Sequence, residues 1–134
     1  MATRMDYPAD VIDRMTASWA RRDLNGMFAE VAEDVEYISA TGKHWRGLDE
    51  VRRGWTELME AGYSIDPIWE EQSQSFLTPD IAVVTQVGRL KDLTLPDGRR
   101  LPTARTFATS VLVREGGRWL VKHGHSSTFF ADAL

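Results

Sequence analysis

The chain has 134 residues, a formal net charge of −4, 43% hydrophobic residues and no cysteine. This length and even composition indicate one domain with a substantial hydrophobic core, and the acidic balance argues against the basic surface that nucleic-acid phosphates require. The lack of cysteine excludes disulfides, thiolate nucleophiles and the usual structural zinc sites.

The first ten residues carry Arg4, Asp6 and Asp10 and contain no apolar segment, so they do not resemble a signal peptide. No later run is long and apolar enough to cross a membrane. We therefore expect a cytoplasmic protein that contacts neither a membrane nor nucleic acid.

Apolar residues at helical spacing predict three helices in the first half of the chain. The first covers residues 8–22, and Asp6 is available to cap it. The second covers residues 24–33, and the third runs from residue 48 until Gly62 ends it.

A short strand is predicted over residues 35–40, where alternation places Tyr37 and Ser39 on one face. A turn follows at residues 41–43, and His44 then lies in the loop that leads to the third helix.

The second half of the chain is rich in Val, Thr, Ile, Phe and Trp, which favours strands. Turn residues divide it into four strands, predicted over residues 64–77, 81–95, 102–115 and 118–129. Such short turns make successive strands antiparallel neighbours. The predicted order is α-α-β-α-β-β-β-β, an α+β fold in which three helices pack on a strongly curved, mostly antiparallel sheet and leave an internal pocket.

Both ends of the chain carry residues of a known family. Val11-Ile12-Asp13-Arg14, Asp23-Leu24-Asn25-Gly26-Met27, Glu33-Asp34-Val35 and Gly47 resemble the opening of SnoaL-like domains in the nuclear-transport-factor-two-like superfamily. The end is more specific. The segment from Gly117 to Ser127, with Trp119, His123-x-His125 and the serine that follows, resembles the last strand of these domains and of the calmodulin-dependent kinase association domain.

The resemblance spans nearly the whole chain and implies one cone-shaped SnoaL-like domain over residues 1–134. It also implies a homodimer formed through the outer face of the sheet. Members of the superfamily isomerise steroids, cyclise polyketides, open epoxides, or only bind and assemble. The fold alone therefore does not decide the function.

Ketosteroid isomerases in this superfamily use a tyrosine on the first helix, a general-base aspartate on the first strand and a protonated aspartate on a later strand. An overlay places Met15, Ser39 and Thr109 at these positions. These side chains cannot perform that proton transfer, so we do not expect isomerisation by that route. The overlay predicts that Thr109 faces the pocket.

The same overlay assigns Met15, Trp19, Tyr37, Ser39 and Trp55 to the pocket. They would make an aromatic pocket with a few hydroxyls, suited to a flat apolar ligand held by one or two hydrogen bonds. The alternative is that Met15, Trp19 and Trp55 simply fill the core.

Alternation in the last strand places Lys122, Gly124 and Ser126 on one face. The family resemblance implies that this face points toward the pocket. Lys122 would then be a cation able to attract a carboxylate or phenolate. His123 and His125 would face the outer, dimer-forming side. They have the spacing of a two-ligand metal pair, but no third ligand is evident, and we expect no metal and no organic cofactor.

His44 is the remaining candidate, because it is placed near the mouth of the pocket. We expect a homodimeric protein that binds a small apolar molecule, with an isomerase, cyclase or hydratase reaction by acid–base chemistry as an option. The alternative is a non-catalytic binding or assembly module with a vestigial pocket. An epoxide hydrolase ranks last, because we cannot assemble the paired carboxylates that it needs.

Overall fold

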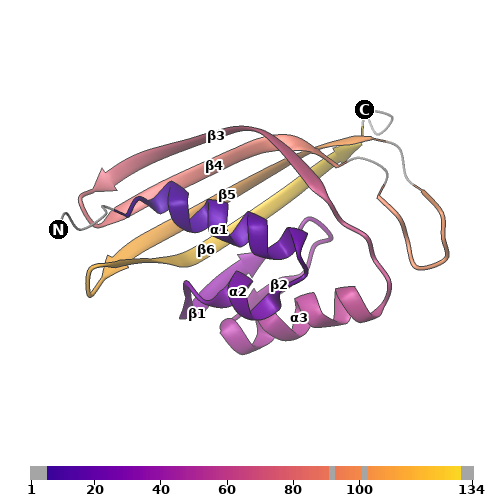
Figure 1. Ribbon diagram of the computed structural model, residues 1–134, viewed down its shortest axis with the longest axis horizontal. Helices are drawn as coiled ribbons and strands as arrows, with labels where there is room; N and C mark the ends of the chain where they lie inside the picture. Colours follow the sequence, from indigo (N-terminus) through magenta and orange to yellow (C-terminus); the bar gives the residue numbers. More distant parts are fainter. Residues whose placement is uncertain (1–5, 91–92, 101–102, 131–134) are drawn as a thin grey trace.

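The computed structural model describes residues 6–90, 93–100 and 103–130 of the chain. These residues form helices packed against one curved sheet, which confirms the α+β class (Figure 1). The helices are α1 (Pro8–Ala20), α2 (Leu24–Phe28) and α3 (Leu48–Glu60), and the strands are β1 (Val31–Ile38), β2 (His44–Arg46), β3 (Pro67–Thr78), β4 (Ile81–Leu90), β5 (Ala104–Glu115) and β6 (Arg118–Phe130).

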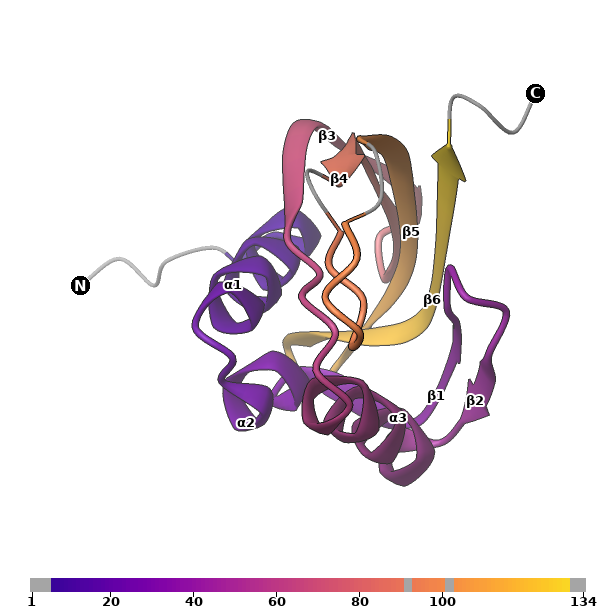
Figure 2. The same ribbon diagram turned by 90° about the vertical axis from the view of Figure 1, so that its right-hand side faces the viewer.

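The six strands lie in the order β2-β1-β6-β5-β4-β3. The last four strands form the predicted antiparallel meander. Strand β1 is parallel to β6, and β2 is antiparallel to β1. Figure 2 shows that the sheet is not closed, and that α1, α2 and α3 lie on the side toward which it curves.

Helix α1 begins at a proline, as expected, because the fixed φ of proline suits the first turn of a helix. Pro8 is its first residue, and the Asp10 carboxylate accepts a hydrogen bond of 2.8 Å from the Tyr7 N–H. The prediction that Asp6 caps this helix is wrong, because its carboxylate is 3.1 Å from the guanidinium of Arg14 instead.

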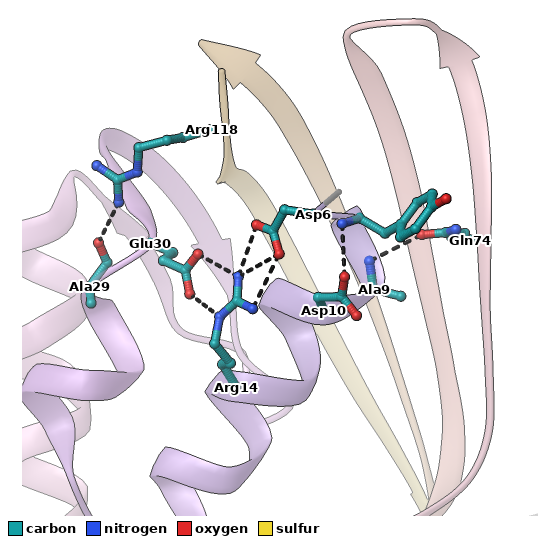
Figure 3. Close-up of polar contacts among 9 residues, drawn as sticks. Asp6, Ala9, Asp10, Arg14, Ala29, Glu30, Gln74 and Arg118 are labelled. Carbon is teal, nitrogen blue, oxygen red and sulfur yellow. Dashed lines mark hydrogen bonds and ion pairs between the residues drawn. The ribbon is translucent and has the colours of Figure 1, made fainter. Parts of the chain in front are cut away.

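Arg14 joins the start of α1 to the turn that precedes β1 (Figure 3). Its Nε lies 2.7 Å from a carboxylate oxygen of Glu30, while Nη2 contacts Asp6. The hydrogen bonds to Glu30 and Asp6 raise the pKa of Arg14 above its ordinary value. The group is about half exposed, with 46% of its side-chain surface accessible, so solvent screens this ion pair.

Two predictions for the first half of the chain are wrong, one about the length of a helix and one about a loop. The second helix begins after its N-cap Asp23 but ends at Phe28, and Val31 already belongs to β1, because Val31 pairs with Val121 of β6. The segment after the predicted turn is not a loop, since His44–Arg46 pairs with β1 as strand β2.

The second-half strands match the predicted ones with shifted ends. Strand β3 begins at Pro67, while residues 64 and 94 form an isolated bridge. Residues 91–92 and 101–102, which the predicted strands included, lie outside the described residues. Turns with a positive φ at Gly98 and Gly117 connect the later strands, as glycine permits.

The core lies between α1 and the concave face of the sheet. Val11 of α1, Val84 of β4 and Leu112 of β5 are fully buried. Burial of such aliphatic side chains is the main favourable term in folding. Within the described residues, no helix is both long and apolar enough to cross a bilayer.

Candidate functional site

A cavity of about 260 Å³ lies between the concave face of the sheet and helices α1 and α3. Helix α1 lines it with Ile12, Met15 and Trp19, and α3 lines it with Val51, Trp55 and Leu58. Among the described residues that line it, none is Asp, Glu, His, Lys or Arg. A mainly apolar lining with a few polar groups is typical of small-molecule sites.

Three aromatic side chains form one wall of the cavity. The rings of Trp19 and Trp55 meet edge to face with centroids 4.9 Å apart, and Trp55 lies 6.0 Å from Tyr37. The Trp19 indole N–H donates a hydrogen bond of 2.8 Å to the carbonyl of Ile65. This bond and the ring contacts fix the position of the Trp19 indole in the wall.

The hydroxyls of Tyr37 and Ser126 form the polar contact on β1 and β6, with their oxygens 2.7 Å apart. Gly124 makes room for the tyrosine ring, since a Cβ there would lie 2.7 Å from its Cδ2. Burial raises the pKa of the Tyr37 phenol. The phenol is therefore neutral at pH 7 and can donate a hydrogen bond.

Ser39 also borders the cavity, but its hydroxyl is engaged in the turn between β1 and β2. Its Oγ lies 2.9 Å from Oγ1 of Thr41 and accepts a hydrogen bond of 3.1 Å from the Lys43 N–H. Ser39 therefore shapes the turn and offers less to a ligand than the Tyr37–Ser126 pair does.

Several polar residues of the cavity were missed by sequence reasoning. Gln86 and Thr106 are buried polar side chains that line it, and Ser110 and Thr128 line it too. For Gln86, Thr106 and Ser110 the signal that could have found them is the alternation of β4 and β5, once a fully buried residue such as Leu112 fixes which positions face inward.

Six of the eight predicted pocket residues border the cavity: Met15, Trp19, Tyr37, Ser39, Trp55 and Ser126. The prediction for Thr109 is wrong, because Thr109 is exposed on the outer face while Ala108 and Ser110 line the cavity. The overlay of that strand was displaced by one residue, and a shift of one residue exchanges the two faces.

The prediction for Lys122 is wrong as well. The pairing of β5 with β6 shifts between Val111 and Leu112, so that Val121 and Gly124 both face inward. This β-bulge breaks the alternation on which the prediction depended. Lys122 instead forms an ion pair with Asp34, whose pKa is lowered chiefly by that hydrogen bond.

The three histidines do not line the cavity. His44 contacts Glu36 with 2.6 Å between Nε2 and Oε2, and His123 lies 3.5 Å from the other oxygen of that carboxylate. The hydrogen bond from His44 is the main cause that lowers the pKa of Glu36. His125 is exposed on the outer face. His44 therefore belongs to a surface ion-pair cluster rather than to the cavity.

Comparison with known proteins agrees with this architecture. The model of the family described as SnoaL-like domain matches residues 9–132. No curated protein matches the sequence.

Solved structures share the fold at low sequence identity. An uncharacterized protein with a cystatin-like fold from Caulobacter vibrioides has a TM-score of 0.80 and 23% identity, over 93% of this chain and 89% of that one. A ketosteroid isomerase-like protein from Erwinia carotovora atroseptica has a TM-score of 0.80 and 16% identity, over 90% and 92%. An NTF2-like protein of unknown function from Pseudomonas putida has a TM-score of 0.73 and 21% identity, over 89% and 82%.

Proposed function

The chain belongs to the SnoaL-like domain family, whose model matches residues 9–132, and we propose that it uses its cavity to bind a small, neutral, largely apolar molecule. The observation that carries the proposal is the lining itself. Aromatic and aliphatic side chains predominate around a few hydroxyl and amide groups, among them the Tyr37–Ser126 pair, and the described lining residues carry no charge. A charged ligand would lose its hydration there without gaining a counter-ion.

The Tyr37–Ser126 pair supplies the polar anchor of the proposed site. One hydroxyl donates to the other, so one hydroxyl hydrogen remains for a ligand. Because the phenol stays neutral, the pair suits an acceptor such as a carbonyl or ether oxygen. The rings of Trp19, Tyr37 and Trp55, which line the cavity, favour a flat ligand.

Proton transfer would require a base beside the ligand. The described lining provides hydroxyls and amides but no carboxylate or imidazole, and the raised pKa of Tyr37 makes its phenol a donor. We therefore place binding ahead of an isomerase, cyclase or hydratase reaction. This corresponds to the non-catalytic alternative from the sequence, but with a usable pocket rather than a vestigial one.

A fluorescent neutral probe, N-phenyl-1-naphthylamine, tests the proposal by titration. Ala108 lies on the cavity floor and Thr109 next to it points outward, so they form a matched pair for leucine substitution. We expect Ala108→Leu to weaken probe binding at least about tenfold by filling the cavity, since that factor is only ~1.4 kcal/mol, and Thr109→Leu to leave the affinity unchanged. Equal affinity in both variants would contradict a ligand site in this cavity.

We also propose that two copies of the chain associate through the outer face of the sheet. Phe107 and Phe129 are exposed large apolar side chains at 36% and 39%, and the pairing of β5 with β6 places them diagonally next to each other. Exposed apolar area on a sheet often marks an interface. We expect Phe107→Glu or His125→Asp to shift the species seen in sedimentation velocity toward monomer, whereas Glu57→Lys on α3 should not. An unchanged dimer in both outer-face variants would argue against this interface.

A further inference from the structure

Resting on the proposed binding function, we propose that Gln86 is a second polar anchor and that it determines which ligands fit. The ligand would then be an elongated, neutral molecule with a hydrogen-bonding group at each end, one for Tyr37 and Ser126 and a hydroxyl for Gln86. Gln86 is only 6% exposed and lines the cavity from β4. A buried primary amide with unused hydrogen-bonding capacity selects partners strongly.

The orientation of the Gln86 amide follows from two neighbours outside the cavity. The Asp13 carboxylate can only accept, and Gln72 Nε2 donates to it at 2.9 Å. Gln72 must therefore turn its carbonyl oxygen the other way, where it accepts from Gln86 Nε2 at 3.0 Å.

This relay leaves the acceptor of Gln86 for the ligand. In the described part of the chain, the bond to Gln72 is the hydrogen bond that the Gln86 side chain makes, so its carbonyl oxygen has no protein partner there. Gln86 also borders a surface depression that Asp13 and Gln72 line, which places the relay in the wall between cavity and surface. An amide held from outside presents its acceptor with little freedom to rotate.

The two anchors stand at opposite ends of one row across the sheet. Gln86 pairs with Ala108, and Ala108 pairs with Ser126. Since neighbouring strands are spaced about 4.8 Å, the Cα atoms of Gln86 and Ser126 are about 10 Å apart. The methyl group of Ala108 lies between them and leaves room for a flat body. The spacing suits a rigid two-ring molecule better than a short one.

Two biphenyl probes separate the anchors. The probe 4,4′-dihydroxybiphenyl has a hydroxyl at both ends, and 4-hydroxybiphenyl lacks one of them. We expect the wild-type protein to bind the diol about 3- to 10-fold more tightly, the size of one net neutral hydrogen bond. Quenching of tryptophan fluorescence measures both dissociation constants, because Trp19 and Trp55 line the cavity.

Substitution by methionine keeps the length of Gln86 but removes its amide. We expect Gln86→Met to bind the two probes with equal affinity, because the second hydroxyl of the diol then has no amide to bind. Gln72→Met should reduce the preference for the diol in part, because Gln72 only positions the amide. Gln74→Met is the matched control for Gln72→Met. Gln74 is on β3, as Gln72 is, but its carbonyl oxygen accepts a hydrogen bond from the Ala9 N–H, and it does not line the cavity. It should keep the full preference.

The outcomes distinguish this inference from the proposed function. Equal binding of both probes by the wild-type protein would overturn the role of Gln86 and leave ligand binding intact. A preference that survives Gln86→Met would do the same. Failure of the wild-type protein to bind either biphenyl or N-phenyl-1-naphthylamine would overturn the binding function itself, and the inference with it. Thermal unfolding monitored by circular dichroism shows that each variant is folded.

Discussion

The space between α1 and the sheet is solid at one end and hollow at the other, although the same three strands form both ends. At the solid end, Ala82, Leu112 and Val121 face inward in one row and are 0%, 0% and 4% exposed. In the hollow part, the row two positions beyond Val84 of β4 consists of Gln86, Ala108 and Ser126. The inward side chains thus change from aliphatic to small or polar one row earlier on β5 and β6, at Ser110 and Gly124, than on β4, where Val84 in that row is still aliphatic.

This difference shows how one sheet forms both part of the core and the floor of a cavity. Small side chains on the floor leave volume, and close packing would ordinarily remove it. Trp19 of α1 and Trp55 of α3 contact each other on the helical side of the cavity, with centroids 4.9 Å apart. The bulge at Lys122 lies at the same boundary. We therefore expect the solid end to contribute more to the free energy of unfolding than the hollow end does.

The largest effect is expected from truncating the solid end. Leu112→Ala should lower the free energy of unfolding by about 3 kcal/mol, since it leaves a cavity in a fully buried place. Ser110→Ala, two residues along the same strand, should change it by less than about 1 kcal/mol. Urea unfolding measures both. Similar losses would mean that the two ends do not differ in their contribution to stability.

A smaller loss of stability is expected from a substitution at Gly124, against which the ring of Tyr37 packs. Gly124→Ala brings a Cβ to 2.7 Å from Tyr37, and the ring must move. We expect a loss of about 1–2 kcal/mol from overpacking together with weaker binding of N-phenyl-1-naphthylamine. The double variant with Tyr37→Leu should recover the stability but not the binding. If Gly124→Ala binds the probe normally, the ring position is not important for the site.

Arg14 tests the link between α1 and β1 at the surface. Arg14→Gln removes the contacts with Asp6 and Glu30 and should lower the free energy of unfolding by about 1 kcal/mol at low salt. The difference in unfolding free energy between the variant and the wild type should shrink in roughly 1 M salt, where the Debye length falls to about 3 Å and exposed charges are screened. A difference that does not depend on salt would indicate lost packing of the side-chain stem instead.

The smallest effect concerns the buried phenol at alkaline pH. The pKa of Tyr37 is raised in the folded state, so the unfolded chain releases this proton first. Its stabilising contribution is complete below the unfolded pKa of about 10 and is lost as the pH rises from there through the folded value. Tyr37→Phe should make the free energy of unfolding fall less steeply above that pH. An equally steep fall would show that Tyr37 titrates normally.

The sequence predicted the elements whose pattern is long. Helices α1 and α3 and the four strands of the meander were found because many residues repeat one period. Strand β2 has three residues, too few to show alternation, and it forms only because β1 provides a partner. The aromatic wall of the cavity was predicted from the overlay on the SnoaL-like family, and the helical spacing of Trp19 and Trp55 and the alternation of Tyr37 with Glu36 fit that assignment.

The wrong site predictions all concern which way a strand faces. Strand β5 carries small hydroxylated residues on both faces, so Thr109 and Ser110 could not be distinguished without their neighbours. Lys122 was misplaced because a bulge adds one residue, which no periodic pattern reveals. Gln86 was overlooked because a polar residue in a strand ordinarily faces water.

By itself, the sequence determined the class of the fold, the order of its main elements and the aromatic character of the pocket. The fold class and the order of elements follow from local spacing and side-chain chemistry, and the character of the pocket follows from the family resemblance, which local residue motifs carry. The tertiary structure decided the register of β5 and β6, the place of the bulge and the relay from Asp13 to Gln86. Those depend on contacts between residues far apart in the chain, and a contact of that kind leaves no periodic trace in the sequence.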